Sequence, residues 1–209
     1  MSDLQNPIVS IDDPQAIPYA LAALAADELI VFPPDTLYGL AGKINETSLQ
    51  KIYAAKQRPD EKAIPVLVGD LQQLDQLAST VEPQVMALMQ VFWPGPLTLV
   101  VPKKVGLPPS LSPYPGLAVR MPDHHFALSL LQQTGPLAVT SANISGGQNP
   151  TTAEDVYAQL KGRVGLILDG GKLPGGKAST IIDCQSDEPT LLREGPIPFE
   201  DILNVWGKV

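Results

Sequence analysis

The sequence predicts an α/β protein with a mixed sheet. Short apolar segments typical of strands alternate with helical patterns along the 209 residues. Three strand-like segments, at 166–169, 180–183 and 190–192, come late and close together, which favours antiparallel pairing among them. With 44% hydrophobic and 17% charged residues, the chain can bury one substantial core. We therefore expect a single domain over residues 1–209, with both parallel and antiparallel strands in its sheet.

The other elements are predicted in chain order from the apolar pattern, with short apolar segments assigned to strands and longer periodic ones to helices. Helices are expected at 18–26, 47–55, 71–78, 83–92, 126–133 and from about 151 to 160. Further strands are expected at 29–32, 64–68, 97–101, 117–121 and 137–140. The last helix has the clearest start, because Thr151 and Thr152 each precede an acidic side chain by three residues, as in a capping box.

Composition excludes several classes of protein. A net charge of −8 and a pI near 4.6 argue against a broad nucleic-acid-binding surface but leave room for a local basic pocket. No apolar run approaches the roughly 18 residues of a membrane span, and the first residues lack signal-peptide features, so we expect a soluble cytoplasmic protein. One cysteine and two histidines exclude a disulfide framework and an ordinary Cys/His zinc site. Cys184 itself lies in an apolar run and is expected to be buried.

An apolar run at 136–139 ends abruptly in hydroxyl and amide side chains. Ser141 and Asn143 follow it, and Gly146 and Gly147 come next. If the extended geometry persists, Ser141 and Asn143 point to the same side, because side chains alternate along a strand. They would then form a hydrogen-bonding surface at a strand end, where open α/β sheets bind ligands. The alternative is an Asx-rich turn that only closes the strand.

A basic cluster follows the helix predicted at 47–55. Lys56, Arg58 and Lys62 place three of the 14 cations of the chain within seven residues. Pro59 disfavours helical geometry at Arg58, so Lys56 and Arg58 are expected to turn toward one cleft and to be exposed there. A flexible lysine beside a forked arginine suits phosphate oxygens. The alternative is that these cations only complement the helix dipole.

Two other patterns suggest catalytic sites but lack essential parts. Residues 171–178 have the glycine and lysine spacing of a P-loop, but Ala178 stands where a Ser or Thr should bind magnesium, and the residues that follow favour a strand. We interpret this segment as a flexible glycine loop that closes over a ligand. His124 and His125 suggest a hydrolase with Ser141, but no nucleophile-elbow motif surrounds that serine.

Taken together, the motifs occur in the order found in the YrdC/Sua5 family, which the chain resembles from about residue 17 to residue 197. The matching segments are Pro34-Asp35-Thr36-Leu37-Tyr38-Gly39-Leu40, Lys56-Gln57-Arg58, Phe92-Trp93-Pro94-Gly95-Pro96-Leu97-Thr98, Val119-Arg120-Met121-Pro122, Ser141-Ala142-Asn143, Ser179-Thr180-Ile181-Ile182-Asp183 and Leu192-Arg193-Glu194-Gly195. The resemblance implies a twisted mixed α/β fold around a deep, positively lined cavity.

The resemblance also implies a nucleotidyltransferase activity. Members of the family combine L-threonine, bicarbonate and ATP into threonylcarbamoyl-adenylate and pyrophosphate. A tRNA threonylcarbamoyl transferase then uses the product to modify adenosine 37 of tRNA. Mg²⁺ is expected to arrive with ATP, without metal ligands from protein side chains. Weak tRNA binding is compatible with this role, and no membrane partner is expected.

Carried over residue by residue, the resemblance implies two groups of ligand-binding side chains. The side chains implied to bind ATP are Lys56, Arg58, Lys62, Ser141, Asn143 and Arg193. Those implied to bind threonine are Thr36, Arg120 and Ser179. Lys56 and Arg58 would also be catalytic, because they neutralise the charge that develops on the phosphates. Arg120 would fork onto the threonine carboxylate.

The chain departs from the family pattern at Pro34, where a threonine or serine is usual, and at Ala63, where a proline is common. It ends shortly after Arg193, without the C-terminal domain of the longer Sua5 type, and so resembles the short single-domain type. One alternative is a non-catalytic nucleotide- or RNA-binding paralogue, a branch that tends to lose the Lys-x-Arg and Ser-x-Asn pairs present here. The other is a carbamoyl-transferring domain of hydrogenase-maturation proteins, whose acylphosphatase and zinc-finger segments are missing here.

Overall fold

The computed structural model describes residues 7–35, 37–57, 62–175 and 177–208. Their strands form one sheet in the order β1-β8-β2-β3-β7-β4-β6-β5-β9-β10. The strands are β1 (Ile8–Ser10), β2 (Ile30–Phe32), β3 (Gly39–Gly42), β4 (Val66–Leu67), β5 (Leu97–Pro102), β6 (Gly116–Arg120), β7 (Leu137–Ser141), β8 (Leu166–Asp169), β9 (Thr180–Asp183) and β10 (Thr190–Arg193). The pairs β1–β8, β2–β8, β4–β6 and β5–β9 are parallel and the others antiparallel, which confirms the predicted mixed sheet.

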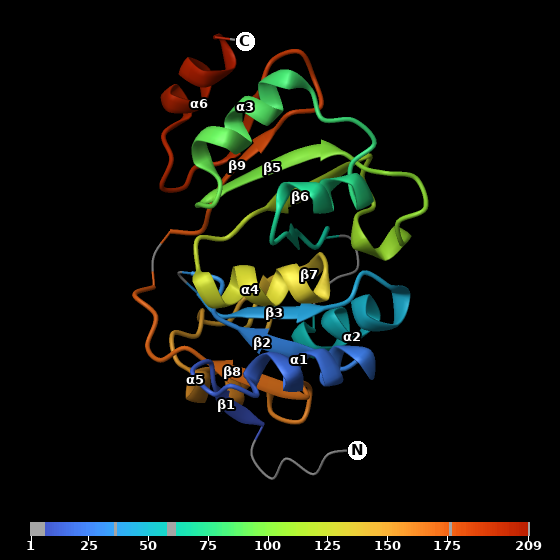
Figure 1. Cartoon of the computed structure of the whole chain (residues 1–209), viewed down its shortest axis with the longest axis vertical. Coiled ribbons are helices and arrows are strands. Elements are labelled where there is room, and N and C mark those ends of the chain that lie inside the picture. Colours follow the sequence, from blue (N-terminus) through green and yellow to red (C-terminus); the bar gives the residue numbers. More distant parts are fainter. Residues whose placement is uncertain (1–6, 36, 58–61, 176, 209) are drawn as a thin grey trace.

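Helices lie along both halves of the sheet (Figure 1). They are α1 (Ala16–Ala25), α2 (Glu46–Lys56), α3 (Pro83–Phe92), α4 (His125–Thr134), α5 (Ala153–Leu160), α6 (Phe199–Trp206) and the 3₁₀ helices η1 (Leu71–Gln76) and η2 (Pro109–Leu111). Apolar residues of α1 and α4 share one core cluster with β2, β7 and β8. Residues of α2, α3, α5 and α6 belong to a second cluster, on the opposite side of the sheet. None of the helices in the described ranges is long and apolar enough to cross a membrane.

Most predicted elements are found within two residues of their expected bounds. The capping box of α5 is confirmed, because the Thr152 hydroxyl accepts from the Asp155 amide and the Asp155 carboxylate accepts from the Thr152 amide. The helix expected at 71–78 is instead the 3₁₀ helix η1. Four further elements were not predicted, namely β1, β3, η2 and α6.

The expected pairing of the last three strands is only partly right. β9 and β10 are antiparallel neighbours, but β8 lies in the other half of the sheet, parallel to β1 and β2. Leu166 and Leu168 contribute to the cluster with α1, while Ile167 contributes to the opposite cluster. A strand buried on both faces is typical of parallel pairing, so burial decided the position of β8 and sequence proximity did not.

The glycine-rich segment after β8 leads directly into β9. Its described part, residues 170–175 and 177–179, contains no helix. A P-loop needs a helix whose N-terminus binds the phosphate, so the rejection of a P-loop at 171–178 is confirmed.

Candidate functional site

A cavity of about 840 Å³ lies over one face of β5, β6 and β9. Because side chains alternate along a strand, every second residue faces this cavity. The residues of these strands that line it are Thr98, Val100, Gly116, Ala118, Arg120, Ile181 and Asp183. Between them, Leu99 and Val119 face the opposite side and join the core cluster that contains α3. The deep cavity implied by the family resemblance is therefore present.

Arg120 is held in the cavity wall by two contacts. Its Nε donates to the carbonyl oxygen of Gly95 at 2.9 Å, and its Nη2 forms an ion pair with the Asp35 carboxylate. Burial, together with a smaller effect of the nearby charge of Arg193, lowers the pKa of Arg120 to about 10, so the guanidinium stays protonated at neutral pH. Arg120 thus presents a positive charge to the cavity while holding one carboxylate, that of Asp35, on its own chain.

Ser179 joins the start of β5 to the late strand β10. Its hydroxyl lies 2.7 Å from that of Thr98 and accepts from Arg193 Nη2 at 3.0 Å, and its carbonyl oxygen accepts from Arg193 Nε at 2.9 Å. Burial lowers the pKa of Arg193. Gly195 allows this arrangement, because a Cβ there would lie 2.2 Å from the amide nitrogen of Thr180. Ser179 and Arg193, expected from the resemblance to contact threonine and the nucleotide respectively, are therefore direct neighbours.

Lys56 is buried, with 2% of its surface exposed, so its expected exposure is wrong. Its Nζ donates to the carbonyl oxygen of Ser141, to the carbonyl oxygen of Asn143 at 2.6 Å and to Asn143 Oδ1 at 3.2 Å. The reason is its place on α2, since Leu49, Ile52 and Lys56 lie on one buried face of that helix. The ammonium therefore binds the loop after β7 from within the protein.

The Ser141 hydroxyl donates to Asn143 Oδ1 at 2.6 Å, so the two side chains lie together, although β7 ends at Ser141. Ser141 lines the cavity. Asn143 is 6% exposed, and its Nδ2 donates to the carbonyl oxygens of Ile144 and Gly147 at 3.0 and 2.8 Å. Asn143 therefore closes the turn after β7, as the alternative interpretation expected, while Ser141 alone of the pair lines the cavity, and its contact with a ligand stays a prediction.

Comparison with known proteins places this arrangement in a family. The model of the Sua5/YciO/YrdC family, which carries the description "Telomere recombination", matches residues 22–195. The chain belongs to this family. All the motifs quoted from the sequence lie within the matched residues.

Individual relatives agree with the family assignment. The chain is 42% identical to the threonylcarbamoyl-AMP synthase of Bacillus subtilis over 96% of its own length and 59% of that protein. It is 37% identical to a putative threonylcarbamoyl-AMP synthase of Mycobacterium tuberculosis over 90% of its length and 88% of that protein. The crystal structure of Pyrococcus abyssi Sua5 complexed with L-threonine superposes with a TM-score of 0.86 at 37% identity, over 92% of this chain and 58% of that one. The chain therefore spans less than two thirds of the B. subtilis and P. abyssi proteins.

Three residues with expected roles in this Sua5/YciO/YrdC domain lie in or near the basic cluster and the first motif. Thr36 and Arg58 fall outside the described residues, so their roles stay predictions. Lys62 is exposed and adjoins Ala63, which lines the cavity. The hydroxyl of Tyr53 in α2 lies 3.0 Å from the carbonyl oxygen of Lys62. Lys62 is thus tethered through its backbone, but it is not among the described residues that line the cavity, so its contact with ATP stays a prediction.

Tyr38 is a structural residue of the site for which no role was predicted. Its hydroxyl lies 2.7 Å from the carbonyl oxygen of Gly171 and 3.0 Å from Asp169 Oδ1, and it accepts from the Gly170 amide at 3.1 Å. Burial raises the pKa of Tyr38 well above its usual value, so the phenol stays protonated. The side chain lines the cavity and anchors the start of the glycine loop, whose Ala178 also lines it.

The two histidines and the cysteine lie away from this cavity wall. His124 caps α4, where its Nδ1 accepts from the Ala127 amide at 3.4 Å. Neither His124 nor His125 is among the described residues that line the cavity, so a hydrolase site with Ser141 has no geometric basis. Cys184 is buried as predicted, and burial raises its pKa to about 12.

Proposed function

We propose that this chain is a nucleotidyltransferase that converts L-threonine, bicarbonate and ATP into threonylcarbamoyl-adenylate and pyrophosphate. The observation that carries the proposal is the cavity, which places Arg120 and Arg193 among hydroxyl groups in a protein of net charge −8. A volume of about 840 Å³ is toward the upper end of the roughly 300–1,000 Å³ of ligand sites, so a nucleotide and an amino acid fit together. The 42% identity to a B. subtilis protein of this activity supports the same reaction.

The threonine side of the proposed site is built around Arg120. Its Nε and Nη2 are engaged by Gly95 and Asp35, which fixes the plane of the guanidinium and leaves Nη1 to face a second carboxylate. We assign that carboxylate to threonine. Ser179, whose hydroxyl is fixed by Thr98 and by an arginine, and Thr36 complete this side of the site.

The nucleotide side of the proposed site lies at the end of β7. Ser141 offers a hydroxyl to the cavity, and Arg58 and Lys62 supply charge-assisted contacts to the phosphates. Lys56 adds its positive charge from within the loop that it binds, and Asn143 fixes the shape of that loop. Arg193 reaches the nucleotide from β10. This assignment keeps the six residues that the resemblance implies for ATP binding. Within it, Lys56 and Asn143 act on the nucleotide through the loop after β7 and do not touch it directly.

The proposed reaction needs no protein nucleophile. The threonine amine takes up bicarbonate with loss of water to give a carbamate, and a carbamate oxygen forms a bond to the α-phosphorus of ATP. The bond from that phosphorus to the oxygen bridging to the β-phosphate breaks, and pyrophosphate leaves. Positioning of the two substrates and neutralisation of the phosphate charge by Lys56 and Arg58 then supply the catalysis.

Mg²⁺ fits the proposed site as a companion of ATP. Two carboxylates, Asp35 and Asp183, are found among the described residues that line the cavity, and Asp35 is engaged by an arginine. Mg²⁺ prefers substrate phosphates with one or two carboxylates to an all-protein site. The ion, when bound, would withdraw charge from the phosphates, whereas the arginines and lysines of the chain orient them.

The proposed product is an activated carbamoyl group that a second enzyme must use. We assign that step to a tRNA threonylcarbamoyl transferase in the cytoplasm, which modifies adenosine 37, and we expect the present chain to contact tRNA only weakly because of its net negative charge.

The proposal is tested by measuring pyrophosphate released from ATP by the purified protein. Release should require threonine and bicarbonate together, and serine in place of threonine is the matched control. Equal release without threonine would contradict the proposal, and ATP binding without any release would favour the nucleotide-binding paralogue instead.

A further inference from the structure

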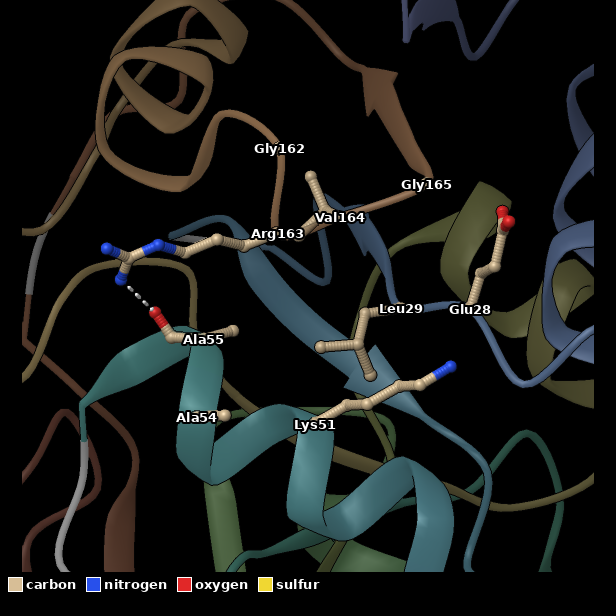
Figure 2. A pocket seen from close by; sticks show the side chains of 9 residues that line it. All are labelled: Glu28, Leu29, Lys51, Ala54, Ala55, Gly162, Arg163, Val164 and Gly165. Atoms are coloured by element: carbon tan, nitrogen blue, oxygen red, sulfur yellow. Dashed lines mark hydrogen bonds between the residues drawn. The ribbon is translucent and has the colours of Figure 1, made fainter. Parts of the chain in front are cut away.

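A groove of about 460 Å³ lies on α2 near the segment at residues 162–165 that leads into β8. Figure 2 shows its charged side chains pointing to opposite ends, with the Arg163 guanidinium directed toward the end of α2 and the Lys51 ammonium directed away from it. Because these cations do not converge, the groove has no centre for an anion. Its informative feature is the contact that Arg163 makes, since Nη1 donates to the carbonyl oxygen of Ala55 at 2.8 Å.

This contact falls on the last turn of α2, whose carbonyl groups have no partners within the helix. The carbonyl oxygens of Tyr53 and Ala54 accept from the Gln57 amide, and that of Lys56 accepts from the Ser145 amide. Arg163 supplies a side-chain donor for the remaining carbonyl of this turn, that of Ala55. Its charge also complements the negative end of the helix dipole.

The last turn of α2 is also the element from which Lys56 reaches the loop after β7. Three hydrogen bonds of the Lys56 ammonium end on Ser141 and Asn143, and Ser141 lines the cavity. Hydrogen bonds weaken with small changes of distance and angle, so these contacts depend on where the helix end is held. Arg163 is exposed and lies outside the cavity, so it can affect the site only through α2.

We propose that Arg163 is a positioning residue for the nucleotide side of the cavity. By holding the Ala55 carbonyl, it fixes the last turn of α2, which sets the Lys56 ammonium against the loop that carries Ser141. The inference deepens the proposed function, on which it rests for the identity of the nucleotide. It requires that loss of the Arg163 guanidinium weakens ATP binding and leaves threonine use unchanged.

The test compares Arg163→Ala and Arg163→Lys with Lys161→Ala. Lys161 is the matched control, because it is an exposed cation two residues away that lies over the Tyr157 ring, 5.4 Å from its centroid. ATP affinity is measured by calorimetry, and the Michaelis constants for ATP and threonine are measured by pyrophosphate release. Arg163→Ala should weaken ATP binding about 3- to 10-fold, less than the full loss of a charge-assisted hydrogen bond because the effect is transmitted through α2. Arg163→Lys should recover part of the loss, and Lys161→Ala should bind ATP like the unmodified protein.

The outcomes separate this inference from the proposed function. Unchanged ATP affinity in Arg163→Ala would overturn the inference, and so would a parallel loss of ATP affinity and threonine use with a lower melting temperature, because that pattern indicates general destabilisation. If the unmodified protein released no threonine-dependent pyrophosphate while Arg163→Ala still bound ATP more weakly, the positioning role would stand and the proposed function would fail.

Discussion

Lys56 and Asn143 meet in the interior of the protein, where the lysine Nζ lies 2.6 Å from the carbonyl oxygen of Asn143 and 3.2 Å from its Oδ1. The two residues are separated by 87 positions in the chain. Asn143 Oδ1 also accepts from the Ser141 hydroxyl at 2.6 Å, so one amide oxygen joins the ammonium to a side chain of the cavity wall. Hydrogen bonds between Lys56 and Asn143 therefore link the Lys-x-Arg motif directly to the Ser-x-Asn motif.

This linkage predicts that Lys56→Met lowers both stability and activity. Methionine keeps roughly the length of the side chain but removes the ammonium donor from the buried carbonyl oxygens of Ser141 and Asn143, at a cost of about 1–3 kcal/mol for each group. Pyrophosphate release should slow by roughly 10- to 150-fold, the equivalent of one charge-assisted hydrogen bond. Urea unfolding and the pyrophosphate assay measure the two effects.

Lys62→Met is the control for stability, because the Lys62 side chain is exposed and its loss should leave the unfolding free energy nearly unchanged. A Lys56→Met protein as stable as the unmodified one would show that the buried ammonium does not hold the loop.

The strands under the cavity could be predicted because their pattern is local. β5, β6 and β9 were each predicted within one residue, since their apolar residues must be buried against α3 whatever ligand is bound. β3 was not predicted, because Gly39-Leu40-Ala41-Gly42 lacks the β-branched residues typical of strands. Gly39 is required by packing against a residue far away in the sequence, because a Cβ on Gly39 would lie 2.8 Å from Val139 Cγ1.

The candidate site was predicted as a set of residues but not as an arrangement. The contact between Lys56 and Asn143 depends on the order of strands in the sheet, which the sequence does not encode locally. The burial of Lys56 did have a local signal, because it continues the helical spacing of Leu49 and Ile52. Helix α6, which was not predicted, also had a local signal in the sequence, because Glu200 and Asp201 form an acidic first turn after Pro198.

Cys184 provides a test of burial that depends on pH. Its pKa is raised from 9.0 to about 12, with burial as the main cause and Asp183 as a second one. Because the folded pKa lies above the unfolded one, the neutral thiol favours the folded state below pH 9, and this stabilisation is lost as the pH rises from about 9 to about 12.

We expect the difference in unfolding free energy between the unmodified protein and Cys184→Ser to shrink over that range. The thiol should also resist alkylation at pH 8 until the protein unfolds. Rapid alkylation of the native protein at pH 8 would contradict the burial of this side chain.

The last prediction separates the two substrate pockets by paired variants. Arg120→Ala should raise the threonine concentration needed for half-maximal activity by roughly 10- to 150-fold, because the carboxylate of the amino acid loses its charge-assisted contact with Nη1. ATP binding should stay close to that of the unmodified protein. Asn143→Ala should do the reverse, because it removes one of the three acceptors of Lys56 and the hydrogen bonds to Ile144 and Gly147 that shape the nucleotide side. Calorimetric titration with ATP, beside threonine-dependence curves, measures both effects.

Arg120→Lys is the control that distinguishes a fork from a charge. A lysine can still pair with Asp35 in the cavity but cannot bind two carboxylate groups in one plane, so threonine use should recover only in part. Loss of ATP binding in Arg120→Ala with normal threonine dependence would reverse the assignment of the two pockets. The reaction could still be the proposed one in that case, because pyrophosphate release measures the chemistry and the variants measure which wall of the cavity holds each substrate.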